Sequence, residues 1–280
     1  MSATLSTAFI AQFDAEVKQA YQGAAKLFGT VRTKTGVIGS THRFPKLGKG
    51  LAQPRIPQTD VVPMNVQHSN ATATLEDWNA PEYTDIFNQS KVNFDERKEL
   101  KEAIASAMGR RMDQLLIDAA DAGASATQVA TSVGGADTGL NVDKLRRAKR
   151  LLDAAGVPAN ERTFVHSAIG LEQLLGETSA TSADFNSVKA LVNGEMNTFL
   201  GFTFVLIEDR DEGGLSVAAG DVRKNFAYHK AALGLAIGMD MKTEINYVPE
   251  KTSWLTNGTF SAGSVGIDDA GIIEVLTDET

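Results

Sequence analysis

The sequence has no cysteine among its 280 residues. Disulfide bonds, thiolate nucleophiles and cysteine-ligated metal sites are therefore excluded together. The four histidines are scattered, and none has the spacing of a metal-binding motif such as H-E-x-x-H. The phosphate-binding G-x-x-x-x-G-K-[ST] loop and the G-x-S-x-G nucleophile turn are also missing. We therefore expect no metal and no cofactor.

Membrane and nucleic-acid signals are weak as well. No apolar run approaches the roughly 20 residues that a helix needs to cross a bilayer, and no basic segment followed by an apolar one marks a secretory signal. The formal net charge is −8, which disfavours a protein that coats nucleic acid, because neutralising phosphates requires clustered lysine and arginine. These features predict an acidic intracellular protein without membrane or sequence-specific nucleic-acid binding.

Two groups of residues remain as candidates for chemistry. Acidic residues gather in the range 208–212, and His229 is followed directly by Lys230. A solvated turn is the ordinary setting for such acids, and neighbouring residues such as His229 and Lys230 point to different faces of a helix or strand. One hypothesis is an enzyme of unknown class that uses these groups. The other is a structural protein in which His229 and Lys230 pack and form hydrogen bonds.

The first part of the chain contains a helical pattern and then a long irregular region. Apolar residues at i, i+3 and i+4 spacing over 4–28 predict an amphipathic helix, which either faces the core or packs on a neighbouring subunit. Five of the seven prolines follow within 33–81, together with several glycines. Proline removes ladder donors, so this region predicts a loosely paired two-stranded excursion rather than a core element.

The strongest helix signal lies at 93–123. Asp95 and Glu96 stand in its first turn, where the helix dipole favours acidic groups. Apolar residues from Leu100 to Leu116 form one stripe, and Gly123 is the expected terminator. At 1.5 Å per residue such a helix is about 45 Å long. This length and the single stripe predict a strut.

The rest of the chain alternates between helix and strand signals. Helices are expected over 141–156 and 168–176, and strands over 162–167 and 201–209. Further strands are expected near the C-terminus, over 242–248, 259–268 and 271–277. The spacing of Gly234 and Gly238 indicates close backbone packing. We therefore predict an α+β fold.

Three segments, taken in order, resemble one family. "TVRTKTGVIGSTHRFPKLGKG" (30–50), "NFDERKEL" (93–100) and "YHKAALGLAIGMDMKTEINYVPEKTSWLTNGTFSAGSVGIDDAGIIEV" (228–275) are similar to major capsid proteins of tailed bacteriophages. The resemblance covers nearly the whole chain and implies the Hong Kong 97-type fold. It implies an N-terminal arm over 1–32, an extended loop over 33–92, and a spine helix with the first part of the peripheral domain over 93–140. An axial domain over 141–235 and peripheral-domain strands with the C-terminus over 236–280 would complete the subunit.

The resemblance also implies a function. The protein would self-assemble, as pentamers and hexamers, into the icosahedral shell that encloses a double-stranded DNA genome, in a virion built in the host cytoplasm. Because the chain begins directly with the arm, a separate scaffolding protein is expected, together with a portal protein, and a decoration protein is a further candidate partner. An encapsulin-like cargo compartment is the alternative within the same fold.

Charged residues are the candidates for contacts between subunits. Basic groups in the extended loop would pair with acids of an adjacent subunit. The candidates are Arg43, Lys46, Lys49, Arg55, Glu76, Asp77, Asp95 and Glu96. The type member of the fold also forms a Lys–Asn isopeptide bond, for which Lys46 or Lys49 and Asn246 or Asn257 are the residues available. We expect this cross-link to be absent.

Overall fold

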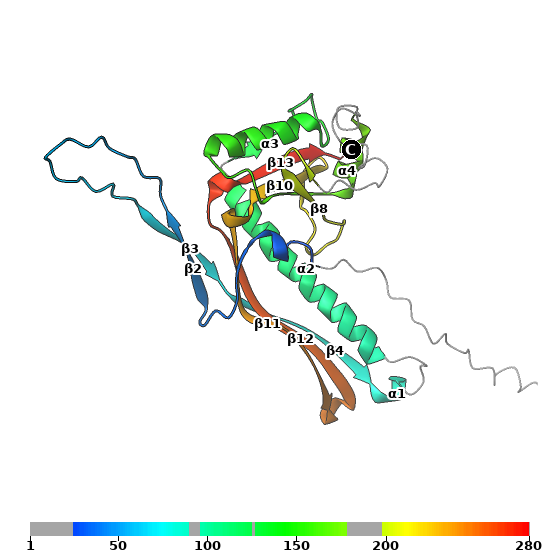
Figure 1. Ribbon diagram of the computed structural model, residues 1–280. Coiled ribbons are helices and arrows are strands. Elements are labelled where there is room, and N and C mark those ends of the chain that lie inside the picture. The colour runs from blue at the N-terminus through cyan, green and yellow to red at the C-terminus, as the bar shows by residue number, and fades with distance from the viewer. Residues whose placement is uncertain (1–24, 90–95, 125–126, 178–197, 280) are drawn as a thin grey trace, which may run out of the picture.

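The computed structural model describes residues 25–89, 96–124, 127–177 and 198–279 (Figure 1). Two sheets, a long helix and a projecting hairpin make up this part of the chain, so the predicted α+β class is confirmed. The helix predicted over 4–28 falls almost wholly outside the described residues. Only its last four residues are described, and Phe28 begins the short 3-10 helix η2 (Phe28–Thr30).

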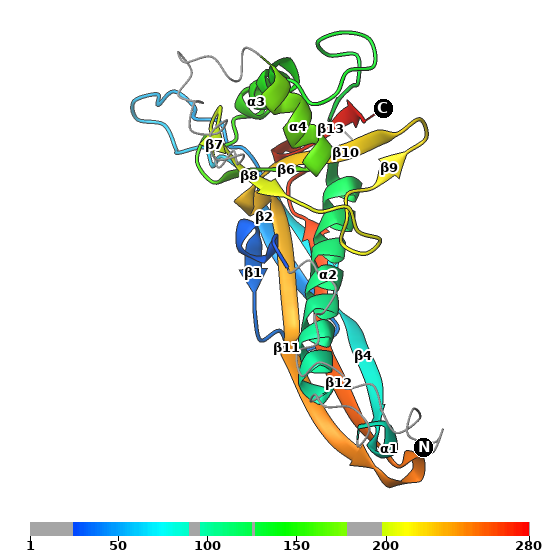
Figure 2. The same ribbon diagram turned by 90° about the vertical axis from the view of Figure 1, so that its right-hand side faces the viewer.

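The longer sheet forms the elongated part of the subunit. Its strand order is β1 (Arg32–Lys34), β11 (Leu233–Val248), β12 (Ser253–Gly266) and β4 (Glu76–Asp85). β1 runs parallel to β11, and the other pairs are antiparallel. The short 3-10 helix η5 (Pro249–Lys251) connects β11 to β12. The strands expected at 242–248 and 259–268 are thus parts of one long hairpin (Figure 2).

The second sheet has seven strands at the other end of the subunit. Its order is β5 (Gln128–Val129), β13 (Ile272–Asp278), β10 (Val222–His229), β6 (Arg162–His166), β8 (Phe202–Leu206) and β7 (Thr198–Phe199), with β9 (Val217–Ala218) paired to β10. Helices α3 (Val142–Ala155) and α4 (Ala168–Gly176) pack beside it. The helices and strands predicted for this region are present.

Helix α3 shows why the local prediction succeeds. The Asn141 side chain caps its first turn by accepting a 2.8 Å hydrogen bond from the Lys144 backbone N–H. Gly156 ends the helix with φ of 77°, a left-handed conformation that glycine adopts without strain. Apolar residues at helical spacing are buried against the sheet. Lys144 is buried with them, and its Nζ donates to the Thr138 carbonyl.

The spine helix α2 (Glu96–Ala124) contacts both sheets (Figure 2). Most of the predicted apolar stripe, from Ile104 to Leu116, belongs to one core with residues of the long sheet, such as Phe260, and of the seven-stranded sheet, such as Phe226. The helix continues past Gly123, where an added Cβ would lie 2.7 Å from Ile272 Cδ1. Gly123 therefore permits close packing rather than ending the helix. One continuous core along α2 explains how a strut connects the two sheets.

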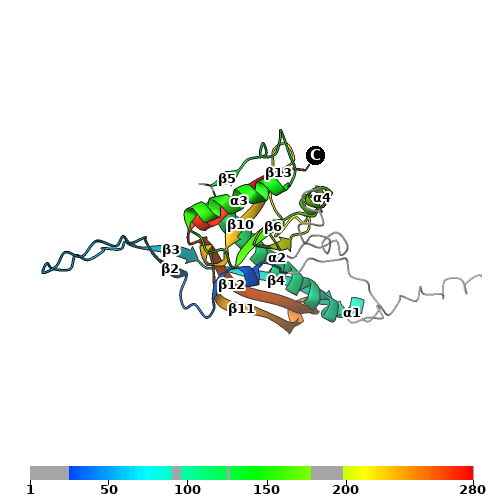
Figure 3. The same ribbon diagram turned by 45° about the horizontal axis from the view of Figure 1, so that its top comes forward.

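The Pro- and Gly-rich region forms a hairpin that projects from the body (Figures 1 and 3). β2 (Thr41–Leu47) pairs with β3 (His68–Thr74) over seven residues, so its base is more regular than predicted. Phe44 anchors this base on β11, because Gly234 leaves no side chain where the Phe44 ring lies. Gly238 similarly lies against Leu75. The close packing predicted from the two glycines is confirmed.

The division of the chain into an arm, a loop and two domains stays a proposal, but strand pairing bears on two of its boundaries. β4, within the range predicted for the extended loop, pairs with β12 along its whole length. β13, within the range predicted for the peripheral domain, pairs with β10 in the seven-stranded sheet. The projecting part is therefore limited to 41–74.

Candidate assembly surfaces

The tip of the β2–β3 hairpin presents apolar side chains to solvent. Between the two strands, residues 48–67 contain no described strand or helix. Six large apolar residues of the hairpin are more than half exposed: Leu47, Leu51, Ile56, Val61, Val62 and Met64. Several large exposed apolar side chains on one projecting segment are typical of a protein contact site. The hairpin therefore has the chemistry of a surface that a neighbour covers.

The basic residues predicted for this loop have different environments. Arg43 is exposed on β2, and Arg55 is exposed in the tip. Lys46 forms an ion pair of 2.8 Å with Asp268 of its own chain. Lys49 donates a 3.3 Å hydrogen bond to the Ala155 carbonyl at the end of α3. Two of the four basic residues thus hold the hairpin to its own subunit.

The predicted acidic partners lie elsewhere. Glu76 and Asp77 are exposed at the beginning of β4. Glu96 is the first described residue of α2, and Asp95 lies outside the described residues. Among the described side chains, the basic candidates and Glu76 and Asp77 form no ion pair with one another within the subunit. Contacts of these residues between subunits stay a proposal.

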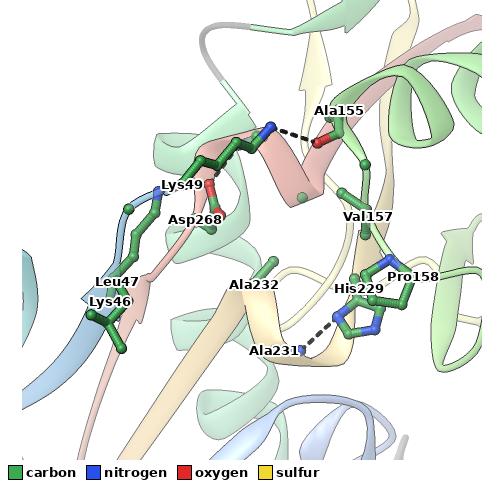
Figure 4. Close-up of a pocket in the computed structure, with 14 residues that line it drawn as sticks. Lys46, Leu47, Lys49, Ala155, Val157, Pro158, His229, Ala231, Ala232 and Asp268 are labelled. Carbon is green, nitrogen blue, oxygen red and sulfur yellow. Dashed lines mark hydrogen bonds and ion pairs between the residues drawn. The ribbon is translucent and has the colours of Figure 1, made fainter. Parts of the chain in front are cut away.

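A pocket lies where the hairpin meets the seven-stranded sheet (Figure 4). Its volume is about 540 Å³, and Lys46, Lys49 and Asp268 lie along one side of it. Pro158 and His229 lie on the other side. The Lys49 hydrogen bond to Ala155 reaches across the pocket to the end of α3, whereas the Lys46–Asp268 ion pair lies along one side of it.

Three of the four acids at 208–212 form ion pairs. Glu208 pairs with Lys26, Asp209 pairs with Arg223 at 2.8 Å, and Glu212 lies 3.8 Å from Arg111. Burial alone would raise the pKa of Glu208, but the hydrogen bond and charge of Lys26 lower it overall. A carboxylate stabilised in its charged form suits a structural ion pair better than proton transfer.

The side chains of His229 and Lys230 contact different groups and do not converge on one site. The His229 Nδ1 accepts a 3.1 Å hydrogen bond from the Ala231 N–H and so caps the 3-10 helix η4 (Lys230–Ala232). Lys230 instead faces Glu161 at 3.5 Å. Burial lowers the pKa of His229, which favours the neutral ring that accepts this hydrogen bond. The predicted packing and hydrogen-bonding role of this pair fits these contacts.

The described residues contain neither a metal-binding cluster nor a membrane-spanning helix. Within 25–89, 96–124, 127–177 and 198–279, no three His, Asp or Glu side chains are arranged to hold a metal ion. No helix in the same ranges has the length and apolarity needed to cross a membrane.

The structure combines a projecting hairpin with exposed apolar residues, an elongated body of two sheets, and charged residues that form structural ion pairs. The exposed hairpin is the feature suited to contact a neighbouring subunit. The phage capsid protein family matches residues 5–279, so the chain belongs to this family. It is a major capsid protein, a subunit of a bacteriophage shell, with the Hong Kong 97-type fold. The resemblance found in the sequence is confirmed.

Solved structures show the same fold at low sequence identity. The capsid of the cyanophage P-SCSP1u matches with a TM-score of 0.79 and 17% identity over 99% of this chain and 95% of the other. The head of the Helicobacter pylori bacteriophage KHP40 has a TM-score of 0.79 and 9% identity over 100% and 99%. A protein of Mycobacterium phage Che8 has a TM-score of 0.72 and 15% identity over 95% and 97%. A search of curated proteins found no match.

The sequence did not indicate the structural role of Asp113. Asp113 lies on α2 with no exposed surface and receives hydrogen bonds from Arg210 and from the backbone of Lys26 and Leu27. A single carboxylate near the middle of an amphipathic helix is an ordinary surface residue by pattern alone. The one available signal was its position directly beside Met112 of the apolar stripe.

Proposed function

We propose that this capsid protein forms pentamers and hexamers that together enclose a double-stranded DNA genome. The observation that carries the proposal is the projecting hairpin with its six exposed apolar residues, on a chain that matches the capsid family along nearly its whole length. A closed shell repeats the same contacts around every symmetry axis, so each subunit needs a surface that reaches a neighbour. The acidic balance of the chain, −8, fits an inner wall that does not bind packaged DNA tightly.

The proposal includes a structural rather than enzymatic role. Glu208, Asp209 and Glu212, together with His229 and Lys230, are occupied by pairs and caps that stabilise the fold. We also propose that a separate scaffolding protein guides closure and that a portal protein occupies one vertex, in a virion assembled in the host cytoplasm. A decoration protein on the outer surface is a further proposed partner.

Electron microscopy and mass measurement test the proposal directly. The protein is expressed alone and together with the products of neighbouring genes, and the particles are sized by light scattering and imaged. We expect closed or polymorphic shells of megadalton mass containing five- and six-fold capsomers. A protein that remains a monomer or small oligomer under every one of these conditions would contradict the proposal. Shells that package a cargo enzyme instead of DNA would support the encapsulin-like alternative.

A further inference from the structure

Among the described residues, nothing pairs with the outer edge of strand β11 along its distal half. On the side away from β12, β1 pairs with Gly234–Ala236, and the Val37 N–H donates to the Ile237 carbonyl. Beyond this point, no strand within the described ranges pairs with that side of β11. Figure 2 shows β1 beside only the upper part of β11. An open edge presents backbone N–H and C=O groups in the arrangement that adds another strand.

Apolar side chains accompany this open edge. Ile245 is 41% exposed and Tyr247 is 42% exposed. Thr243, Ile245 and Tyr247 are two residues apart along β11, so their side chains point to the same face of the sheet. Thr243 pairs with Gly258 of β12, and Gly258 lies beneath Met108 of α2. Ile245 and Tyr247 therefore lie on the face that packs against α2. A long edge strand with exposed apolar residues normally causes aggregation unless a partner covers it. This edge therefore needs an occupant in the working assembly.

The pairing of β11 with β12 limits how much of the edge can accept a strand. Register shifts occur between Ile237 and Met239 and between Met239 and Lys242. From Lys242 to Val248 the ladder is regular. Irregularities of this kind bend a strand and interrupt pairing. The edge available for strand addition is thus the seven-residue segment 242–248.

This segment is complementary to a second copy of itself. If two copies run antiparallel about a dyad at Ile245, Ile245 faces Ile245 and Tyr247 faces Thr243 on the α2 side of the sheet. On the other face, the Asn246 amide faces the Glu244 carboxylate of the other copy and can donate to it. Glu244 is already paired with Lys242 in its own chain, so the two acids are compensated as they approach. Ile245 thus faces an apolar partner, Asn246 faces a hydrogen-bond acceptor, and Glu244 is neutralised by Lys242, while Lys242 faces Val248 at the two ends of the segment.

We propose that the segment 242–248 of β11 joins the same segment of a neighbouring copy across a two-fold axis, with Ile245 at its centre, so that two long sheets become one. The proposal rests on the proposed shell function, which supplies copies at high local concentration. A two-fold contact is self-complementary by symmetry, and strand addition supplies main-chain hydrogen bonds along with the side-chain pairs.

Single cysteines test the pairing, because the natural chain contains none. Residues directly opposite in an antiparallel pair have Cα atoms about 4.5–5.5 Å apart, which lies within the disulfide range. Each residue from 242 to 248 is replaced by cysteine in turn, and assembled particles are oxidised and run on a non-reducing gel. Val217→Cys is the matched control, since Val217 is exposed at 51% on β9 of the other sheet.

We expect Ile245→Cys to give about tenfold more covalent dimer than Val217→Cys, with less dimer on either side of position 245. A maximum at another position would overturn the proposed register. Well-formed shells without any covalent dimer across 242–248 would overturn the pairing while leaving the shell function intact. Absence of shells from the unsubstituted protein would instead contradict the proposed function.

A second variant tests the same edge without oxidation. Ile245→Lys places two like charges opposite each other at the dyad, and Ile38→Lys introduces the same charge at a residue that is 98% exposed. We expect Ile245→Lys to fold, as judged by circular dichroism, but to yield at least about tenfold fewer closed shells than Ile38→Lys. Equal shell yields from the two variants would overturn the proposal.

Discussion

Asp113 on α2 accepts a 2.7 Å hydrogen bond from Arg210, which follows β8, and both side chains are buried. The same carboxylate accepts 3.0 Å hydrogen bonds from the backbone N–H groups of Lys26 and Leu27. Burial raises the pKa of Asp113, and these hydrogen bonds oppose the rise. One buried carboxylate thus fixes three segments: the spine helix, the residues that follow the N-terminal region, and the loop after β8.

We predict that breaking this pair destabilises the subunit strongly. Asp113→Ala removes the buried carboxylate that pairs with Arg210 and leaves the more exposed Glu208, 3.6 Å away, beside the guanidinium. Loss of a buried partner costs about 3–5 kcal/mol in typical proteins. The double variant Asp113→Leu with Arg210→Met should lose less than the two single variants combined, because it leaves no buried charge. Chemical denaturation of the unassembled subunit measures each free energy of unfolding.

The exposed pair between Asp143 and Arg146 is the matched control. Arg146→Ala should cost no more than about 1 kcal/mol, because solvent screens an exposed pair. Additive losses in the Asp113 and Arg210 variants would mean that the two side chains act independently.

The hairpin tip should be cleaved quickly by trypsin before assembly and slowly afterwards. Lys49 and Arg55 are exposed in a segment with few internal hydrogen bonds, so a neighbouring subunit must provide its protection. Asp268→Asn removes the ion pair of Lys46 and should accelerate cleavage of free subunits further. Mass spectrometry of the fragments over time measures both rates. Equal cleavage rates for free subunits and shells would contradict this prediction.

Gly258 should not tolerate a side chain. An added Cβ would lie 2.2 Å from Met108 Sδ and 2.5 Å from Ile104 Cγ2, at the contact between α2 and β12. Gly258→Ala is therefore expected to lose about 1–3 kcal/mol through overpacking. Gly29→Ala is the control, because no heavy atom lies within 4 Å of the new Cβ. Thermal unfolding compares the two, and equal melting temperatures would show that the helix moves away without cost.

Lys144 provides a test by pH. Burial lowers its pKa from 10.5 to about 8. The folded state therefore releases this proton more readily than the unfolded state, so its contribution to stability grows as the pH rises from about 8 to about 10.5. Relative to Lys144→Met, the natural protein should gain up to about 3 kcal/mol over this window. A constant difference between the two proteins across the window would contradict the lowered pKa.

The shell should be held together without covalent cross-links. Lys46 is paired with Asp268, and Lys49 donates a hydrogen bond to the Ala155 carbonyl. Both candidate lysines for an isopeptide bond are therefore held by groups of their own chain and not directed at an asparagine of a neighbour. Mature particles boiled in denaturing detergent are predicted to give one band near 29.8 kDa. A ladder of larger species would contradict this. Lys46, Lys49, Asn246 and Asn257 would then be the first residues to replace.

Local sequence patterns predicted much of the fold. The α2 stripe and the caps of α3 depend on residues three or four apart, so the sequence alone located these helices. The beginning of β11 was not recognised as a strand, because Leu233–Ile237 are buried on both faces and show no alternation. The place of β13 beside β10 depends on a partner more than 40 residues away and could not be read from either segment.

The candidate surfaces were predicted only in part. The irregular, proline-rich composition marked the projecting hairpin, and the resemblance supplied its role. The partner of Lys46 could not be predicted, because Asp268 lies 222 residues away in the chain. The structural role of Asp113 depends on burial, which an isolated carboxylate in a helical pattern does not reveal.

The chain passes between the two sheets at neighbouring points: β10 continues through η4 into β11, and β12 returns through η6 (Asp269–Gly271) into β13. The two passages are tied together, since the Ile267 N–H donates a 2.7 Å hydrogen bond to the Ala232 carbonyl. Two neighbouring chain segments joined by a hydrogen bond resist bending in the plane that contains both of them. They resist rotation about the line along which they run much less. Any change of shape that a subunit undergoes within a shell should therefore be a twist of the β11–β12 hairpin relative to the seven-stranded sheet, about an axis along α2.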